Sequence, residues 1–416
     1  MSKYVIHGGK RLEGELCIDG SKNAVLPIIA ATLLSGNITY LQHCPRILDV
    51  EIMIEILKQL GCKVEWEQDN LMINTRTLQN CNISEELVKK MRSSIILLGA
   101  LIGRCGEARI SQPGGCQLGA RPIDLHLSAL KQMGVHITEQ QDIIICKSSN
   151  LHGAEISLAL PSVGATENIM LAATLAEGNT NIYNAAKEPE IVDLQDFLVA
   201  CGAKITGAGT EVISIQGVKK LGGVSYRVIP DRIIAGTYLV AAAITRGNIT
   251  LKDIRIEHLI EIIRKLEEVG CHINASSTEV SLMAPSHLHG IELVTEPYPG
   301  YPTDMQSQMM ALLCTCESPS KIKENLFEAR FKPAYELMKM GARIDVDGIE
   351  AKIIPGARLI GTEVNATDLR GGAALVLAGL AAEGCSVVNQ IDYIKRGYQN
   401  IVADLSYLGA HIQEKE

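Results

Sequence analysis

The sequence predicts an α/β protein of two domains, each built from three repeated units of strands and helices. Three observations support this fold class: a glycine junction that recurs six times, a helix that is apolar on all sides in each repeat, and a short strand after each junction. The 416 residues allow two or three domains with an ample core. Because only 4% of residues are aromatic, that core must consist of leucine, isoleucine, valine and alanine.

The glycine junction marks the end of an amphipathic helix and the start of a strand. The six glycines are Gly61, Gly134, Gly202, Gly270, Gly341 and Gly409. They lie 73, 68, 68, 71 and 68 residues apart. These intervals are about twice the usual period of a solenoid, so we interpret each repeat as a small α/β subdomain.

The second helix of each repeat carries no polar face, which predicts that it is buried. The six segments are 26–34, 95–102, 169–176, 233–244, 309–314 and 373–382. The amphipathic partner helices, such as residues 191–200, are expected on the outside. The buried helices of a threefold unit should run roughly parallel.

A further strand follows the glycine strand in five repeats, at residues 71–74, 142–146, 212–216, 279–283 and 350–354. The sixth repeat reaches Glu416 without one, and residues 4–7 have the alternating pattern to supply it. We therefore expect one domain of residues 21–229 and a second of residues 1–20 with 230–416.

Composition narrows the class of protein. A net charge of −8 and few aromatic residues argue against nucleic-acid binding and membrane-surface binding. There is no signal-peptide pattern and no apolar run of about 18 residues, so we expect a cytoplasmic protein. Its 12 cysteines should be reduced and buried, and Cys314 and Cys316 are interpreted as core.

The segment 111–121, SQPGGCQLGAR, places a thiol in a glycine-rich loop. Its glycines and proline exclude a helix interior or a central strand. Pro122 and Asp124 then suit the first turn of a helix that ends near Gly134. A helix N-terminus and a nearby guanidinium attract anions and make a thiol more acidic. Cys116 is thus a candidate reactive residue, with an incidental loop cysteine as the alternative.

Basic residues gather just before the buried helices, where they are disfavoured by the helix dipole. They are Lys22, Arg92, Arg232 and Arg370. If the N-termini share one face in each domain and the two faces meet, these cations and Arg121 surround a cleft for a substrate with several phosphates or carboxylates. Solvated surface charge is the alternative for each one. Asp231 and Asp368 are expected to cap helices or to orient the neighbouring arginines.

Nine motifs distributed along the whole chain match one family in the expected order. They are GSKNA (20–24), PGGCQLGARPIDLH (113–126), SVGATENIM (162–170), AAKEPEIVDL (185–194), YRVIPDRI (226–233), YPTDMQSQ (301–308), FEARF (327–331), ATDLRGGAALVLAGL (366–380) and RGYQNI (396–401). On these motifs the chain resembles the UDP-N-acetylglucosamine 1-carboxyvinyltransferase family of enolpyruvyl transferases. The resemblance implies an inside-out α/β barrel in two domains, each with three βαβαββ-type units.

The resemblance also implies roles for individual residues. The residues expected to bind phosphoenolpyruvate are Lys22, Asn23, Arg121, Arg370 and Arg396. Those expected to bind UDP-N-acetylglucosamine are Arg92, Arg121, Pro122, Ile123, Asp124, Leu125, Ser162, Val163, Gly164, Asp304 and Leu326. Supporting positions are Arg232, Arg330 and Asp368. Many members carry a lysine that contacts the nucleotide where this chain has Leu160, which puts one contact in doubt.

The implied reaction moves the enolpyruvyl group of phosphoenolpyruvate to the 3-hydroxyl of the UDP-sugar and releases phosphate, as the first committed step of peptidoglycan precursor synthesis. It needs an acid, a base and a positive environment, and in principle no metal or cofactor. Cys116 is the candidate acid and the candidate site of a covalent adduct. Asp304 is the candidate base, with helix capping as its alternative. Closure of the domains is expected to exclude water.

Three other functions stay open. The sister transferase that acts on shikimate 3-phosphate shares the fold and the first substrate. A non-catalytic regulator that senses UDP-sugars could keep the fold without the chemistry. A redox thiol protein is a third candidate, although no second cysteine lies near Cys116 in the sequence. The expected partners are the two small-molecule substrates, with no nucleic acid and no membrane, and the oligomeric state is open.

Overall fold

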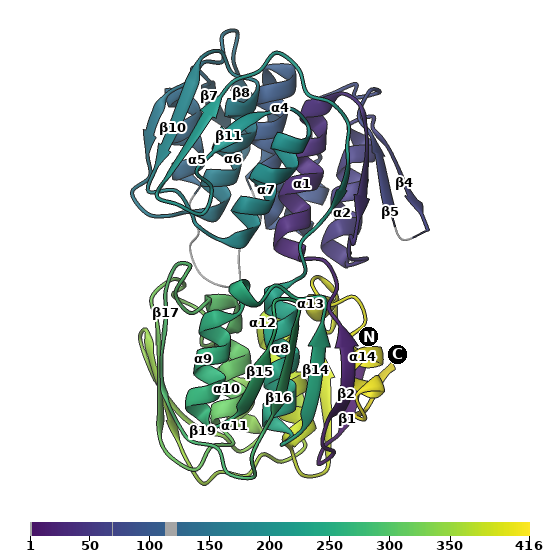
Figure 1. Ribbon diagram of the computed structural model, residues 1–416, viewed down its shortest axis with the longest axis vertical. Helices are drawn as coiled ribbons and strands as arrows, with labels where there is room; N and C mark the ends of the chain where they lie inside the picture. Colours follow the sequence, from purple (N-terminus) through teal and green to yellow (C-terminus); the bar gives the residue numbers. More distant parts are fainter. Residues whose placement is uncertain (1, 69, 113–122) are drawn as a thin grey trace. The chain divides into compact units, whose positions relative to one another are not determined.

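The computed structural model describes residues 2–68, 70–112 and 123–416. The chain divides into two compact units (Figure 1), and the described residues of unit 1 are 2–19 and 230–416. The described residues of unit 2 are 20–68, 70–112 and 123–229. Unit 1 is therefore discontinuous in sequence, and the chain passes between the units after Asp19 and after Ile229.

Unit 2 contains three sheets within its described residues. In strand order they are β13 (Ser225–Arg227), β3 (Ile38–Gln42), β5 (Asn70–Asn74) and β4 (Lys63–Glu67); β6 (Glu107–Ser111), β8 (Ile143–Lys147) and β7 (His136–Gln140); and β11 (Lys204–Thr206), β12 (Val212–Gln216), β10 (Asn179–Tyr183) and β9 (Glu155–Ser157). Its helices are α1 (Lys22–Ser35), α2 (Leu48–Gln59), α3 (Glu85–Lys90), η1 (Arg92–Ile96), α4 (Leu97–Cys105), α5 (Asp124–Gln132), α6 (Val163–Thr174) and α7 (Pro189–Ala200), where η denotes a 3₁₀ helix.

Unit 1 also contains three sheets. In strand order they are β21 (Glu363–Asn365), β22 (Cys385–Asn389), β1 (Lys3–His7) and β23 (His411–Lys415); β15 (His272–Ala275), β16 (Glu279–Met283), β14 (Asn248–Lys252) and β2 (Glu13–Cys17); and β17 (Glu292–Thr295), β18 (Ser320–Glu324), β20 (Glu350–Ile354) and β19 (Arg343–Asp347). Its helices are α8 (Arg232–Ile244), η2 (Ile256–His258), α9 (Ile260–Val269), η3 (Thr303–Met305), α10 (Gln306–Leu313), α11 (Lys332–Lys339), α12 (Leu369–Ala381), α13 (Asp392–Lys395) and α14 (Ile401–Tyr407).

Several strands bury only one of their two faces against the core. In β12 the burial alternates along the strand, with Ile213 and Ile215 buried and their neighbours exposed. Most sheets combine both kinds of pairing, as β14 does, which runs parallel to β2 and antiparallel to β16. The two-residue period of these strands is what the alternating sequence pattern predicts.

The prediction that the apolar helices are buried is confirmed. Every residue of α8 and of α10 is buried, and α12 is buried from Arg370 to Leu380. In unit 2, α1 and α6 are buried along almost their whole length. The predicted helix 95–102 differs from the structure, because a 3₁₀ turn, η1, precedes α4 there.

The glycine junction is confirmed in all six repeats. The φ angles of Gly61, Gly134, Gly202, Gly270, Gly341 and Gly409 are 97°, 86°, 104°, 113°, 96° and 100°. After α2, Gly61 N–H donates to Lys58 O at 3.0 Å and Cys62 N–H donates to Leu57 O at 2.9 Å. The same pair of bonds recurs at the other five junctions. This is a Schellman motif, which requires a left-handed residue and therefore favours glycine.

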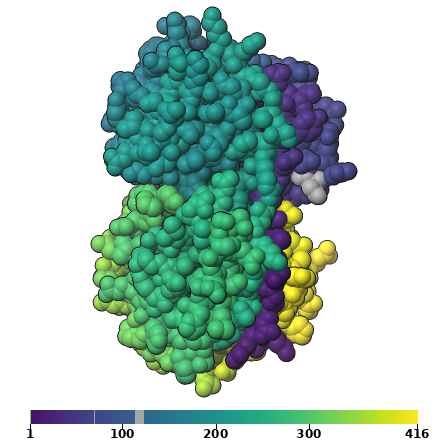
Figure 2. Space-filling view, viewed as in Figure 1, coloured from purple at the N-terminus to yellow at the C-terminus, as the bar shows by residue number. Residues whose placement is uncertain are grey.

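The N-terminal strand lies inside the sheet formed by the last repeat. β1 pairs antiparallel with β22 on one side and with β23 on the other. Figure 2 shows the N-terminal segment beside the C-terminal residues of unit 1. The strand predicted at 142–146 begins one residue later, because Gln141 and Asp142 adopt positive φ angles in the turn that precedes β8.

The prediction that the cysteines are buried is wrong for three of those described: Cys17, Cys105 and Cys385 are exposed. Cys314 and Cys316 are core residues, as predicted. Burial raises the pKa of both thiols to about 12, which keeps them protonated near neutral pH. Across residues 2–68, 70–112 and 123–416, no helix combines the length and apolar composition that a membrane crossing needs.

Glu167 in α6 is a carboxyl group in the core, and its side chain is 3% exposed. Burial raises its pKa well above the ordinary value, and repulsion from Glu190 and Glu188 raises it further. The folded protein thus keeps a proton that the unfolded chain releases above the ordinary glutamate pKa. The free energy of unfolding must therefore fall as pH rises from that range toward the folded-state pKa.

We predict that Glu167→Gln, which is neutral at every pH, unfolds at a higher temperature than the wild type by a margin that grows from about pH 5 to about pH 8. Thermal unfolding followed by circular dichroism across that range measures the margin. The control is Glu177→Gln at an exposed position of the same unit, which should show no growth. A margin for Glu167→Gln that stays constant with pH would contradict the prediction.

Candidate active site

In unit 1 two predicted residues, Arg330 and Arg370, bind the carboxylate of Asp304, which lies on η3. Its Oδ1 accepts a hydrogen bond from Nη2 of Arg330 at 3.0 Å, and its Oδ2 accepts one from Nη2 of Arg370 at 3.0 Å. The two arginine side chains are 1% and 3% exposed, and that of Asp304 is 29% exposed. Pro302 is the residue that precedes η3, so Asp304 is not the N-cap residue of this helix. Its carboxylate is held between two buried guanidinium groups and still reaches solvent.

Arg330 is anchored by the backbone as well. Its Nε and Nη2 donate to the carbonyl oxygen of Thr303 at 3.1 and 2.9 Å, next to Asp304 in the chain. Five donors on a planar guanidinium allow Arg330 to bind the carbonyl and the carboxylate together. The orientation of η3 is thereby fixed by a side chain from the segment that precedes α11.

Arg370, the second residue of α12, is a buried cation of this site. Burial alone would lower its pKa, but attraction to Asp304, Tyr398 and Asp231 raises the pKa above the ordinary arginine value. Its charge is therefore permanent at any accessible pH. Among the described residues, Nη1 of Arg370 has no hydrogen-bond acceptor although it is buried. A buried donor of this kind suits an anionic ligand.

Asp231 and Asp368 are helix caps, as expected. Asp231 Oδ1 accepts from the backbone N–H groups of Ile233 and Ile234 at 2.8 and 3.0 Å. Asp368 Oδ1 accepts from those of Arg370 and Gly371 at 3.0 and 3.1 Å. Each carboxylate therefore fixes the first turn of a buried helix that carries a predicted cation, Arg232 on α8 and Arg370 on α12.

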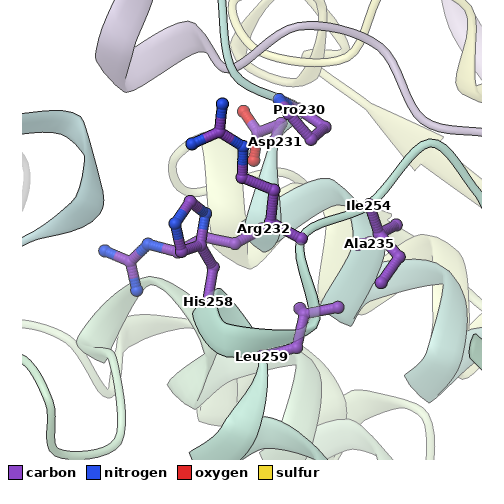
Figure 3. Close-up of a pocket in the computed structure, with 8 residues that line it drawn as sticks. Pro230, Asp231, Arg232, Ala235, Ile254, His258 and Leu259 are labelled. Atoms are coloured by element: carbon purple, nitrogen blue, oxygen red, sulfur yellow. The ribbon is translucent and has the colours of Figure 1, made fainter. Parts of the chain in front are cut away.

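A small pocket lies at the start of α8 (Figure 3) and is lined by Pro230, Asp231, Arg232, Ala235, Ile254, Arg255, His258 and Leu259. The Arg232 side chain extends beside His258, and its guanidinium carbon lies 5.5 Å from the ring centre of Tyr298. Arg396 is the half-buried residue that ends α13, and Leu326 is 37% exposed after β18.

In unit 2, Lys22 begins α1 and forms an ion pair with Asp49 on α2, with 2.8 Å between Nζ and Oδ2. The side chains are 9% and 0% exposed, so the pair is shielded from solvent. Ser21 caps α1 by accepting from Ala24 N–H. The helix end, the ammonium group and Asp49 thus form one fixed electrostatic unit.

The other predicted residues of unit 2 also lie at helix starts. Asn23 follows Lys22 on α1, and Arg92 is the first residue of η1. Ser162 caps α6 through a hydrogen bond from Ala165 N–H at 3.4 Å, which places Val163 and Gly164 in the first turn. Ile123, Asp124 and Leu125 form the start of α5. The predicted residues Cys116, Arg121 and Pro122 lie outside the described residues.

Several residues that contact the predicted site residues of unit 1 and unit 2, or lie on the same helices, were not singled out from the sequence. Asp49 is separated from Lys22 by 27 positions, and an acidic residue in a first helical turn is usually explained by the helix dipole. Tyr398, His126 and Asn168 lie inside recognised motifs, but a motif does not show which side chains contact one another. The feature of the sequence that could have identified Tyr398, His126 and Asn168 is that each lies in one of those motifs.

The chemistry that each group supports follows from its charges. Unit 1 offers a solvent-accessible carboxylate flanked by permanently charged guanidinium groups, which suits proton abstraction next to an anion. Unit 2 offers a lysine and several helix N-termini, which suit phosphate or carboxylate groups. Neither group resembles a metal centre: the described residues hold no cluster of three or more histidine, cysteine, aspartate or glutamate side chains suited to a metal.

The sequence matches the family described as EPSP synthase (3-phosphoshikimate 1-carboxyvinyltransferase) over residues 6–405. It is 50% identical over 413 residues to UDP-N-acetylglucosamine 1-carboxyvinyltransferase 2 of Caldanaerobacter subterraneus subsp. tengcongensis, with 99% of both chains covered. It is 46% identical to the UDP-N-acetylglucosamine 1-carboxyvinyltransferase of Oleidesulfovibrio alaskensis at the same coverage.

Solved structures share the fold. The enolpyruvyl transferase NikO from Streptomyces tendae superposes with a TM-score of 0.90 at 24% identity, covering 100% of this chain and 99% of NikO. EPSP synthase from Acinetobacter baumannii gives a TM-score of 0.74 at 18% identity, with both chains fully covered. Fold and site thus define an enolpyruvyl transferase. The chain belongs to the UDP-N-acetylglucosamine 1-carboxyvinyltransferase family.

We predict that Asp49→Asn lowers the free energy of unfolding by about 3 kcal/mol, because it leaves the ammonium group of Lys22 buried beside a neutral side chain. A urea titration measures the loss. The control is the double variant Lys22→Met with Asp49→Leu, which removes both charges and should be more stable than Asp49→Asn alone. Equal losses in the two variants would show that the charge pair is not the cause.

Proposed function

We propose that this protein transfers the enolpyruvyl group of phosphoenolpyruvate to the 3-hydroxyl of UDP-N-acetylglucosamine and releases phosphate. This reaction is the first committed step of peptidoglycan precursor synthesis, and its place there makes the protein a cytoplasmic enzyme. The observation that carries the proposal is the Asp304 carboxylate held between Arg330 and Arg370, in a chain 50% identical to a relative named for this activity. Such a carboxylate can accept a hydroxyl proton beside an anionic co-substrate.

The fold details belong to the same proposal. Each unit is one domain, residues 21–229 and residues 1–20 with 230–416, and each is an inside-out α/β barrel of three βαβαββ-type units around parallel buried helices. The three sheets of each unit, the six Schellman junctions and the burial of the apolar helices support it.

Phosphoenolpyruvate carries a phosphate and a carboxylate, and the proposed residues for it are basic or amide side chains. They are Lys22, Asn23, Arg121, Arg370 and Arg396. The buried ion pair with Asp49 sets the direction of Lys22, and the unsatisfied Nη1 of Arg370 supplies a donor for an anion. Arg232, Arg330 and Asp368 support these groups without contacting the substrate in this proposal.

The UDP-sugar is proposed to lie on the helix starts of unit 2 and on two positions of unit 1. The residues are Arg92, Arg121, Pro122, Ile123, Asp124, Leu125, Ser162, Val163, Gly164, Asp304 and Leu326. The backbone N–H groups of a helix start and the guanidinium of Arg92 suit a diphosphate. Leu160, which is 56% exposed, offers the nucleotide no charge at the position where many relatives carry lysine.

The proposed chemistry has two balanced stages. In the first, Cys116 donates a proton to C3 of phosphoenolpyruvate and the electron-poor C2 is attacked by the sugar 3-hydroxyl, whose proton passes to Asp304. In the second, C3 of the tetrahedral intermediate returns a proton to the Cys116 thiolate while the bond from C2 to the phosphate oxygen breaks, which restores the double bond. The departing phosphate takes up the proton held by Asp304. Lys22 and the arginines stabilise the charges that develop on the phosphate and carboxylate. The Cys116 sulfur can also add to C2 and form a covalent adduct.

The proposal is tested by phosphate release with two acceptors. Purified protein with phosphoenolpyruvate should release phosphate when UDP-N-acetylglucosamine is present and not when shikimate 3-phosphate replaces it. Release with shikimate 3-phosphate alone would establish the sister activity. Tight binding of the UDP-sugar without phosphate release would indicate the non-catalytic regulator.

Asp304→Asn is the matched control for this assay. It keeps the shape of the side chain and removes the base, so phosphate release should fall by about 10² to 10⁴. Folding of the variant is checked by thermal unfolding. A folded variant with wild-type turnover would exclude Asp304 as the base.

We predict that Cys116→Ser abolishes the covalent adduct that the wild type forms with phosphoenolpyruvate, because a serine hydroxyl is a far weaker nucleophile than a thiol. Intact-protein mass spectrometry detects the adduct, and a small phosphonate epoxide should alkylate the same thiol. The controls are serine variants of the exposed Cys17, Cys105 and Cys385, which should retain both products. An unchanged adduct in Cys116→Ser, or a label mapped to another cysteine, would refute the assignment.

A further inference from the structure

The side chain of Asn168 on α6 connects three segments of unit 2. Its Oδ1 accepts a hydrogen bond from the backbone N–H of Gly99 on α4 at 2.6 Å. Its Nδ2 donates to the carbonyl oxygen of Ile95 on η1 at 3.1 Å and lies 2.7 Å from Nδ1 of His126 on α5. Asn168 is fully buried and His126 is 8% exposed. One amide thus joins α6 to η1, α4 and α5.

The hydrogen bonds fix both the amide and the imidazole. A backbone N–H can only donate and a carbonyl can only accept, so the Asn168 oxygen must face Gly99 and its nitrogen must face Ile95. The second hydrogen of Nδ2 then points at His126, and Nδ1 of His126 must accept it. His126 is therefore the neutral imidazole that carries its proton on Nε2.

α4 and α6 cannot move closer together, because their backbones are already in contact. A Cβ atom on Gly99 would lie 2.2 Å from the carbonyl oxygen of Asn168, so only glycine allows α4 and α6 to approach this closely. A Cβ atom on Gly164 would lie 3.0 Å from Cε1 of His126, so the imidazole packs on the first turn of α6. The junction is a tight contact among three elements.

Three of the four elements that meet at the junction, η1, α5 and α6, carry residues proposed for the UDP-sugar. Arg92 begins η1, Asp124 and Leu125 directly precede His126 on α5, and Ser162–Gly164 begin α6. In the proposed binding mode the diphosphate and the sugar contact η1, α5 and α6 at once. The spacing between these three segments therefore sets the affinity for the UDP-sugar.

We infer that His126 and Asn168 are positioning residues that hold these three segments at the spacing required to bind the UDP-sugar. This inference rests on the proposed function. Neither side chain contacts the substrate in this arrangement; both act through the segments they join. Their loss should weaken binding of the UDP-sugar in the folded protein, which a purely structural role would not do.

The test compares two polar replacements of His126. In His126→Asn, the amide oxygen of the new side chain can occupy the position of Nδ1 and accept the hydrogen bond from Asn168. In His126→Gln, the side chain is longer, so its amide lies near the position of Nε2 and cannot accept that bond. We expect His126→Gln to raise the Kd for UDP-N-acetylglucosamine about five- to tenfold, measured by calorimetry, and His126→Asn to stay close to the wild type. With saturating UDP-sugar, the KM for phosphoenolpyruvate should change less than about twofold.

Asn168→Ala removes the amide that makes all the hydrogen bonds of the junction. It should raise the Kd for UDP-N-acetylglucosamine at least as much as His126→Gln does. Because both variants break one shared bond, the double variant His126→Gln with Asn168→Ala should lose less affinity than the product of the single effects predicts. The control is Thr174→Val on the same helix. Thr174 is also fully buried, but its hydroxyl donates to Met170 O within its own helix α6 rather than to one of the other described helices, so the Kd should not change.

The outcomes separate this inference from the proposed function. A wild-type protein that binds no UDP-N-acetylglucosamine overturns both. A wild type that binds, with folded His126→Gln and Asn168→Ala variants that bind equally well, overturns the inference alone. A lower unfolding temperature without a change in Kd also overturns the inference, since it shows a purely structural role.

Discussion

The constraint on which the structure depends is the burial of helices that are apolar on all sides. α8 and α10 have no residue at the surface, so their flanks cannot carry chemistry. Only the ends of a buried helix can present polar groups to a ligand. The N-terminus also carries a partial positive charge and unsatisfied N–H groups. The predicted site residues Lys22, Ser162–Gly164, Arg232 and Arg370 all lie at such ends. The packing of the core therefore decides where an anionic substrate can bind.

Placing cations at positive helix ends and inside the protein is unfavourable unless each is compensated. Here the compensation is local. Asp49 balances Lys22, and Asp304 lies between Arg330 and Arg370. Asp231 and Asp368 accept hydrogen bonds from backbone N–H groups in the first turns of α8 and α12. Within each unit the predicted cations are thus held in place by carboxylates, and fixed charges of this kind give the most effective electrostatic stabilisation.

Much of the fold could be predicted because it depends on local rules. The left-handed glycines, the apolar helices and the strand periods each follow from a few neighbouring residues, and the boundaries of β12, β16 and β20 are those the sequence predicts. Contacts between distant residues could not be predicted in this way. The pairing of Lys22 with Asp49 and of His126 with Asn168 depends on how helices pack, which no local pattern encodes. For the same reason, the 3₁₀ start at Arg92 and the exposure of Cys105 were missed.

The place of β1 between β22 and β23 has a consequence for how the chain is made. The described residues of unit 2 all lie between Gly20 and Ile229, so its strands leave the ribosome well before β22 and β23 are made. β1 precedes unit 2 in the chain, whereas its two partners, residues 385–389 and 411–415, follow it. Loop closure over such a distance is slow and cannot begin until both partners have been synthesised. Unit 2 can thus fold during translation before the sheet that contains β1 forms, and both edges of β1 stay unpaired until then.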